Sequence, residues 1–263
     1  MHAMATPSAA VVATLAVLSV ACGNPTTESG TTAAKAPAAA SSPASRSSMT
    51  ITDHYEPQID PSKFSTTIDN PYLPLIPGTR IVYDADTAQG KQRTTTEVTR
   101  DTKVVMGVRT VVVHDVVATD GQVTEDTFDW YAQDHDGNVW YFGEDTKEFD
   151  GSAVNTTGSF EAGVAGALPG IVMLGHPQVG DAYRQEFAKG IAEDTGQVVS
   201  LAGSETTPLT GPVSALVVTK DADLLDPNSP PENKYYARGV GLILTVQTAG
   251  PPDREQAVSV EKF

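Results

Sequence analysis

The sequence predicts an all-β domain, mainly antiparallel, that folds as a curved meander, an open barrel or a sandwich with one or two short helices. Runs rich in Val, Ile and Thr recur between short segments of turn residues, as in antiparallel strands. No stretch carries the long 3.6-residue apolar repeat of an amphipathic helix. The sequence also shows no repeat of fixed period, which argues against a propeller.

The expected strands follow an irregular, proline-rich lead-in that ends at Pro77 and Gly78. They cover residues 80–83, 94–100, 103–105, 109–117, 123–133, 138–142, 182–187, 197–202, 215–220, 234–237, 242–247 and 257–263. A glycine- and alanine-rich stretch, residues 158–175, interrupts this pattern. Residues 160–164 and 222–225 are the expected helical turns.

The N-terminal segment has the features of an export signal. An apolar run of 12 residues, 9–20, precedes Ala21 and Cys22. At about 1.5 Å per residue the run is too short to cross a hydrocarbon core of about 30 Å. Its length is typical of the apolar core of a signal peptide, which has about 7–15 residues.

Cys22 is the only cysteine of the chain. The stretch Leu18-Ser19-Val20-Ala21-Cys22 resembles the lipobox of bacterial lipoproteins, with Ser19 where leucine is usual. The resemblance implies that the Cys22 thiol receives a diacylglyceryl group, that cleavage occurs just before Cys22, and that the lipid includes palmitate. The alternative is an ordinary secretory signal with an incidental cysteine. An exported domain held by disulfides would carry several cysteines. Lipidation is favoured because it accounts for a single one.

The chain divides into three parts by composition. Residues 1–21 form the expected signal peptide, and residues 22–48 form the lipidated cysteine and a linker rich in Ala, Ser, Thr and Pro. Such a linker cannot bury enough apolar surface to fold, so we expect it to be disordered. Residues 49–263 form a single β-rich domain, which is a normal size for one sandwich or barrel.

The formal net charge is −16. An acidic domain repels phosphate, which excludes nucleic acid as an expected partner. The negative charge keeps the domain soluble or, alternatively, belongs to an acidic site that binds a cation.

Residues 125–144 hold both tryptophans and are the most distinctive stretch. Asp136 and Gly137 predict a hairpin turn between two aromatic strands, because glycine adopts the positive φ that the turn requires. A three-residue loop would place Tyr131 opposite Tyr141, and Trp130 opposite Phe142. These rings belong to the core or, alternatively, form a ligand-binding platform, whose candidate residues are Trp130, Tyr131, Trp140 and Tyr141.

Oxygen-bearing side chains alternate at the same turn. Asp134, Asp136 and Asn138 have the spacing found at the start of a calcium loop. The glycine of such a loop belongs at its sixth position, whereas Gly137 would be the fourth, so a plain hairpin turn is the competing interpretation. We expect no cofactor other than this Ca²⁺.

Acidic residues could also serve an enzyme, because paired carboxylates perform general acid–base catalysis when one of them is buried. The candidates for such a pair are Asp129, Asp134, Asp136, Glu144, Glu193 and Asp194. For the pair Glu193 and Asp194, a solvated turn is the alternative interpretation.

Three stretches resemble a family of uncharacterised secreted and lipoprotein-like proteins of high-GC Gram-positive bacteria. They are residues 68–79 (IDNPYLPLIPGT), residues 129–144 (DWYAQD, two residues, GNVWYFGE) and residues 235–241 (YYARGVG). The resemblance implies membership but no particular reaction.

The sequence therefore favours an extracytoplasmic lipoprotein, anchored to the outer face of the cell membrane. We expect a monomeric, non-catalytic domain that binds a small molecule, a lipid or an envelope component. The alternatives are a carboxylate-based hydrolase and a structural or interaction module of the envelope.

Overall fold

The computed structural model describes residues 50–51, 54–226, 228–249 and 253–263, so the expected signal peptide, Cys22 and the whole linker lie outside it. Strands form nearly all of the regular structure. The elements are η1 (Pro61–Lys63), β1 (Phe64–Ser65), β2 (Thr79–Thr87), β3 (Gly90–Val105), β4 (Val108–Thr119), β5 (Gln122–Asp134), β6 (Val139–Asp150), β7 (Ala153–Asn155), β8 (Phe160–Glu161), β9 (Leu168–Met173), β10 (Ala182–Arg184), β11 (Glu186–Phe187), β12 (Asp194–Thr207), β13 (Gly211–Asp223), β14 (Glu232–Ala237), β15 (Gly241–Gln247) and β16 (Arg254–Lys262). The described residues include no helix long and apolar enough to cross a bilayer.

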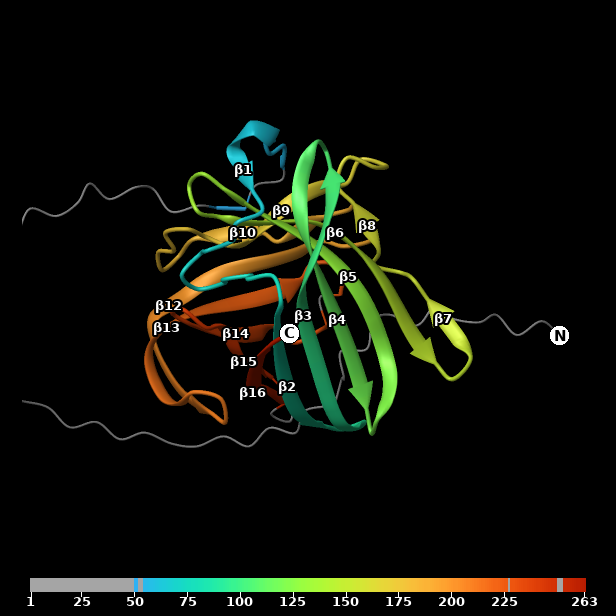
Figure 1. Cartoon of the computed structure of the whole chain (residues 1–263), viewed down its shortest axis with the longest axis vertical. Helices are drawn as coiled ribbons and strands as arrows, with labels where there is room; N and C mark the ends of the chain where they lie inside the picture. The colour runs from blue at the N-terminus through green and yellow to red at the C-terminus, as the bar shows by residue number, and fades with distance from the viewer. Residues whose placement is uncertain (1–49, 52–53, 227, 250–252) are drawn as a thin grey trace, which may run out of the picture.

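All strands join one antiparallel sheet that curls into a nearly closed barrel (Figure 1). Its strand order is β10-β12-β13-β14-β15-β16-β2-β3-β4-β5-β6-β9-β11. The all-β prediction is therefore confirmed, and of the alternatives proposed the barrel is the one formed. Most neighbours are consecutive in the chain, as in a meander, whereas β16 pairs with β2 across the whole length of the domain.

A single stretch of chain brings the two ends of the sheet together. Ala182–Arg184 pairs with β12 and Glu186–Phe187 pairs with β9, with only Gln185 between them. Gly170 on β9 lies directly against this stretch. A Cβ atom added to Gly170 would sit 2.3 Å from the carbonyl carbon of Gln185 and 2.6 Å from the carbonyl oxygen of Arg184. The backbones can approach this closely only because residue 170 has no side chain.

Replacing Gly170 with alanine is expected to cost about 3 kcal/mol of unfolding free energy, because two backbones must separate to admit the methyl group. Urea unfolding measures the loss. The control is Gly121→Ala, at a turn where φ is +81° and no heavy atom lies within 4 Å. Its cost, about 1 kcal/mol, is the strain of a positive φ alone. An equal loss in the two variants would contradict the close approach at Gly170.

Several strands are longer than the sequence predicted. Residues 94–100 and 103–105 were expected as two strands, but they belong to one strand, β3, with an irregularity in its pairing between Val98 and Thr102. The expected helical turns are not formed at their predicted places. Phe160–Glu161 is β8, and residues 222–223 end β13, because pairing with neighbouring strands overrides weak local preference. Among the described residues, helical structure is found in the 3₁₀ turn Pro61–Lys63.

The segment between β1 and β2, drawn in cyan in Figure 1, closes one end of the barrel. We call residues 68–75 the plug. Ile68 and Leu75 are bridged to each other and are buried against Val98, Val113 and other core residues of the wall. The plug contains most of residues 68–79, the first of the three stretches that the sequence analysis singled out.

The other two stretches, residues 129–144 and 235–241, hold the plug in place. The Asn70 side chain donates to the carbonyl oxygen of Gly137 at 2.8 Å, in the aromatic hairpin. The carbonyl oxygen of Pro71 accepts a hydrogen bond from the amide of Gly239 at 2.7 Å. The guanidinium of Arg238 lies 5.8 Å from the ring centre of Tyr72. The three stretches therefore meet at one end of the barrel.

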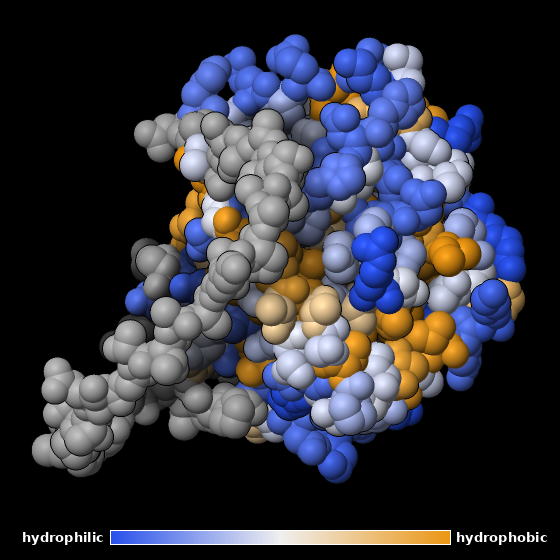
Figure 2. All heavy atoms as spheres, turned by 90° about the vertical axis from the view of Figure 1, so that its left-hand side faces the viewer, coloured by the Kyte–Doolittle hydropathy of each residue, from blue (hydrophilic) through white to orange (hydrophobic). Residues whose placement is uncertain are grey.

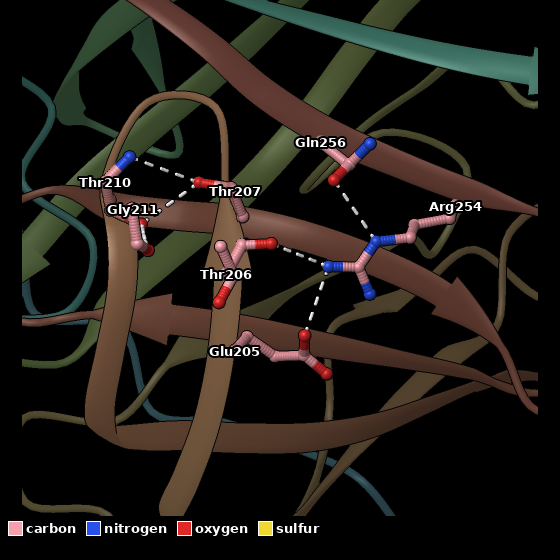
Figure 3. A network of polar contacts seen from close by, with 7 residues as sticks. All are labelled: Glu205, Thr206, Thr207, Thr210, Gly211, Arg254 and Gln256. Atoms are coloured by element: carbon pink, nitrogen blue, oxygen red, sulfur yellow. Dashed lines mark hydrogen bonds and ion pairs between the residues drawn. The ribbon is translucent and has the colours of Figure 1, made fainter.

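The tip of the β12–β13 hairpin folds back over β16 (Figure 3). Arg254 donates to the Glu205 carboxylate at 3.1 Å and to the Thr206 carbonyl at 2.9 Å. Leu209 packs on the outer apolar cluster of β14–β16 and donates its amide to Ala257. The hairpin tip therefore covers the outside of the wall. Val199 and Leu201 on β12 are exposed. Figure 2 shows the side of the molecule on which this hairpin lies, where hydrophobic and hydrophilic residues are intermixed.

Candidate ligand-binding site

The aromatic hairpin divides its side chains between the two faces of the wall. Successive residues of a strand point to opposite faces. Tyr131 and Tyr141 line the interior, and their ring centres lie 5.0 Å apart. The two residues are paired across β5 and β6, as the sequence predicted. Trp130 packs on the other face, where the Lys103 ammonium lies 3.2 Å from its ring centre. The four aromatic residues therefore do not form one platform.

Trp130 lies opposite two residues, Phe142 and Gly143, instead of Phe142 alone as a three-residue loop predicts, and Trp130 and Phe142 pack in the same apolar cluster. The register shifts between Tyr131 and Asp129, where Gly143 on β6 takes a φ of +127°. A bulge of this kind lets one strand carry an extra residue. It also turns the Glu144 carboxyl toward the interior.

Asp134 ties the hairpin turn together. Its two carboxylate oxygens accept hydrogen bonds from the Asn138 amide at 2.9 Å, the Asn138 side chain at 2.8 Å and the Trp140 indole at 2.7 Å. Asn138 in turn accepts from the amide of Gly175 at 2.9 Å. The expected hairpin turn thus explains these contacts. Calcium binding by Asp134, Asp136 and Asn138 stays a prediction, and the described residues contain no cluster of three metal-binding side chains.

The interior of the barrel holds a cavity of about 550 Å³, which we call the lumen. Its polarity changes along the strands. Near the plug it is apolar, and the residues that line it there include Leu73, Leu75, Val98, Val113 and Leu242. Away from the plug the same strands present polar groups, because β5 places Asp129, Thr127 and Glu125 in succession after Tyr131.

Carboxyl groups dominate the polar part of the lumen. Those that line it are Asp115, Glu125, Asp129, Glu144, Glu186, Asp194, Glu232, Asp253 and Glu255. Lys234 is the one cationic side chain that lines it among the described residues. The Lys234 ammonium lies 3.0 Å from the buried Asp221 carboxylate, so its charge is already balanced.

Asp115 and Asp129 form a carboxyl pair on β4 and β5, within hydrogen-bonding reach of each other. Asp129 is only 5% exposed, and its Oδ1 lies 2.6 Å from the Tyr141 hydroxyl. Asp115 accepts a hydrogen bond from Thr96. Burial raises the pKa of Asp129 well above its usual range, and the neighbouring Asp115 carboxylate raises it further. Burial also raises the pKa of Asp115. Asp129 in its protonated form can donate to Asp115, an arrangement in which two carboxyls can share one proton.

Three further carboxyl side chains of the lumen are Glu144 on β6, Glu186 on β11 and Asp194 on β12. Burial raises the pKa of Glu186 to about 9, and the charges of Asp194 and Glu144 add to this effect. Burial likewise raises the pKa of Glu144 to about 7 and that of Asp194 to about 6. Burial alone would lower the pKa of Lys234, but Asp221 holds it well above its usual range. The lumen therefore holds protons at neutral pH.

The structure divides the carboxylate pool that the sequence proposed. Asp129, Glu144 and Asp194 line the lumen. Asp134 and Asp136 lie instead at a second pocket beside the lead-in, and Glu193 pairs with Arg184 at 3.6 Å. The sequence reasoning missed the lumen residues Asp115, Glu186, Glu232, Glu255 and Lys234. The sequence did contain an indication for Asp115. It lies two residues from Val113 and two from Val117, so the three side chains share the interior face of β4.

No protein-family model and no curated protein matches the chain. A solved structure that is similar is that of a protein of Bacteroides fragilis NCTC 9343, described as exported and as having a YmcC-like fold. The similarity covers 73% of this chain and 99% of that chain, with a TM-score of 0.41 and 14% identical residues.

Proposed function

We propose that this chain is an exported, monomeric lipoprotein, anchored to the outer face of the cell membrane through Cys22, whose barrel binds a small ligand without transforming it. The observation that carries ligand binding is the lumen of about 550 Å³. Its volume falls in the range of about 300–1,000 Å³ that is usual for ligand sites, and apolar, aromatic and titratable side chains converge on it. The lone cysteine after the apolar run supports the anchor.

Native mass spectrometry of the protein purified from its own host tests ligand binding. We expect an added mass that is lost in Thr245→Trp, where the indole would fill part of the lumen. The control is Val260→Trp, at a residue 43% exposed on β16. A mass that Thr245→Trp retains would place the ligand outside the lumen. Mass spectrometry of the mature N-terminus tests the anchor, and an unmodified Cys22 would contradict it.

The Asp115–Asp129 pair supports a second candidate, a carboxylate-based hydrolase. Two carboxyls that share one proton can act together as acid and base. For this candidate we expect hydrolysis of 4-nitrophenyl acetate or a 4-nitrophenyl glycoside that is lost in Asp115→Asn. Equal background rates in both proteins favour binding alone.

A further inference from the structure

Acidic side chains in the lumen greatly outnumber basic ones. Nine carboxyl side chains line it, and the lysine that lines it is already paired with Asp221. Among the described residues, no side chain donates a hydrogen bond to the carboxyls of Asp194 and Glu232. The Lys234 charge lowers the pKa of both groups, but burial outweighs it. A buried carboxyl without a hydrogen-bond donor is costly to ionise, so an occupant that brings positive charge would favour its ionised form.

The carboxyls surround the lumen instead of converging on one point. They come from β4, β5, β6, β11, β12, β14 and β16, with Asp253 immediately before β16. A calcium ion draws its oxygen ligands to within about 2.6 Å of one centre. A ring of separated carboxyls fits an organic cation better, because ammonium or guanidinium groups donate several hydrogen bonds in different directions.

The lumen also offers an apolar surface to such a ligand. Leu73, Leu75 and Leu242 line it at the plug, and Tyr131 and Tyr236 lie on the same side. Tyrosine rings attract cations through their faces and also pack on hydrocarbon. The two ends of the lumen therefore differ in the same way as the two ends of an amphiphilic amine.

We infer that the ligand of the lumen is an organic cation with an apolar body, which lies with its hydrocarbon on the plug and its charged group among Glu186, Asp194 and Glu232. This inference rests on the proposed ligand-binding function and names its chemical class. The Asp115–Asp129 pair and Glu144 lie between the two ends, where further amino groups of a longer ligand would meet them.

Isothermal titration of the full chain with octylamine, octanol and octanoate near neutral pH tests the inference. The three probes share a chain length and differ in charge. We expect octylamine to bind at least about tenfold more tightly than octanol, and octanoate more weakly than either, because only the amine can pair with the carboxyls. If octanol bound as tightly as octylamine, the charge inference would fail while ligand binding stood. If none of the three bound, the proposed function itself would fail.

The variants Glu186→Gln and Glu232→Gln separate recognition from folding. Each variant removes a carboxyl group whose pKa is raised by burial, which means that the folded protein holds its ionised form at a cost. We therefore expect the unliganded variants to melt at the same temperature as the parent or higher. Each is nevertheless expected to weaken octylamine binding about tenfold and to leave octanol binding unchanged. The matched control, Glu261→Gln, removes a carboxyl that is 56% exposed on β16 and keeps the parent affinity. Equal octylamine affinity in all three variants would overturn the inference.

Discussion

Replacing Asn70 with alanine is expected to lower the free energy of unfolding by about 4 kcal/mol, since each lost hydrogen bond costs about 1 kcal/mol when its partner stays buried. Asn70 is 1% exposed. Its side chain donates to the carbonyl oxygens of Gly137 at 2.8 Å and Leu174 at 3.1 Å. It accepts from the amides of Tyr72 at 2.8 Å and Leu73 at 3.1 Å. Alanine can replace none of these bonds.

The damage should begin at the plug. Because the Asn70 side chain joins the plug to the hairpin turn, we expect hydrogen exchange of residues 66–78 to accelerate under conditions where the rest of the sheet is still protected. Urea unfolding measures the global loss.

The control for this prediction is Asn155→Ala. Asn155 is half-buried and makes local hydrogen bonds to the Glu148 carboxylate and the Thr157 amide, so its loss is expected to cost less than about 1 kcal/mol. If both variants lost the same stability, the plug would not depend on Asn70.

The second large effect is a fall in stability with rising pH. The folded pKa of Glu186 is about 9, that of Glu144 about 7 and that of Asp194 about 6, all raised chiefly by burial. The unfolded chain releases the same protons near pH 4. Between these limits the folded state binds more protons than the unfolded state, so stability is greatest below about pH 4 for these groups and declines as pH rises through the folded values.

Carboxyls paired with basic groups on the surface make stability depend on pH in the opposite direction, but they do so in a lower pH range. A hydrogen bond from Arg93 lowers the pKa of Asp84, so its contribution is lost only as pH falls below the ordinary aspartate range. From about pH 5 to pH 8 the lumen therefore dominates, and we expect the unliganded protein to lose several kcal/mol of unfolding free energy over that interval. Urea midpoints measured at constant ionic strength across this range give the slope.

Glu186→Gln provides the internal control, because a glutamine cannot ionise. The variant should lose less stability than the parent between about pH 5 and pH 8, with the difference growing steadily across the interval because the folded pKa of Glu186 lies above it. Identical slopes for the variant and the parent would show that Glu186 ionises at its ordinary pKa and faces solvent.

Local pattern was enough to predict part of this fold. Alternating β-branched residues predicted the strands, and Asp136 with Gly137 predicted the turn that places Tyr131 opposite Tyr141. These features depend on neighbours within a few residues, so periodicity and turn chemistry reveal them. The strand β9 was missed because it lies in a stretch rich in glycine and alanine, where Gly170 serves a close approach.

The ligand site depends on contacts that the sequence does not show. The carboxyls of Asp129, Glu144 and Asp194 were visible in the sequence as acidic residues, but nothing local placed them in one lumen with Asp115 and Glu186. A shift of one residue in register moves a side chain to the opposite face, as the bulge at Gly143 demonstrates.

The sequence by itself determined the all-β class, the positions of most strands and turns, and the expectation of export with a lipid on Cys22. Only the tertiary structure decided that the sheet curls into a nearly closed barrel, that the plug closes one end, and that carboxyls line the interior. The reason is physical: closure depends on pairing between β16 and β2 and on the short stretch that joins β9 to β12. The strands β16 and β2 are far apart in the chain, and their register is selected by the packing of the whole sheet.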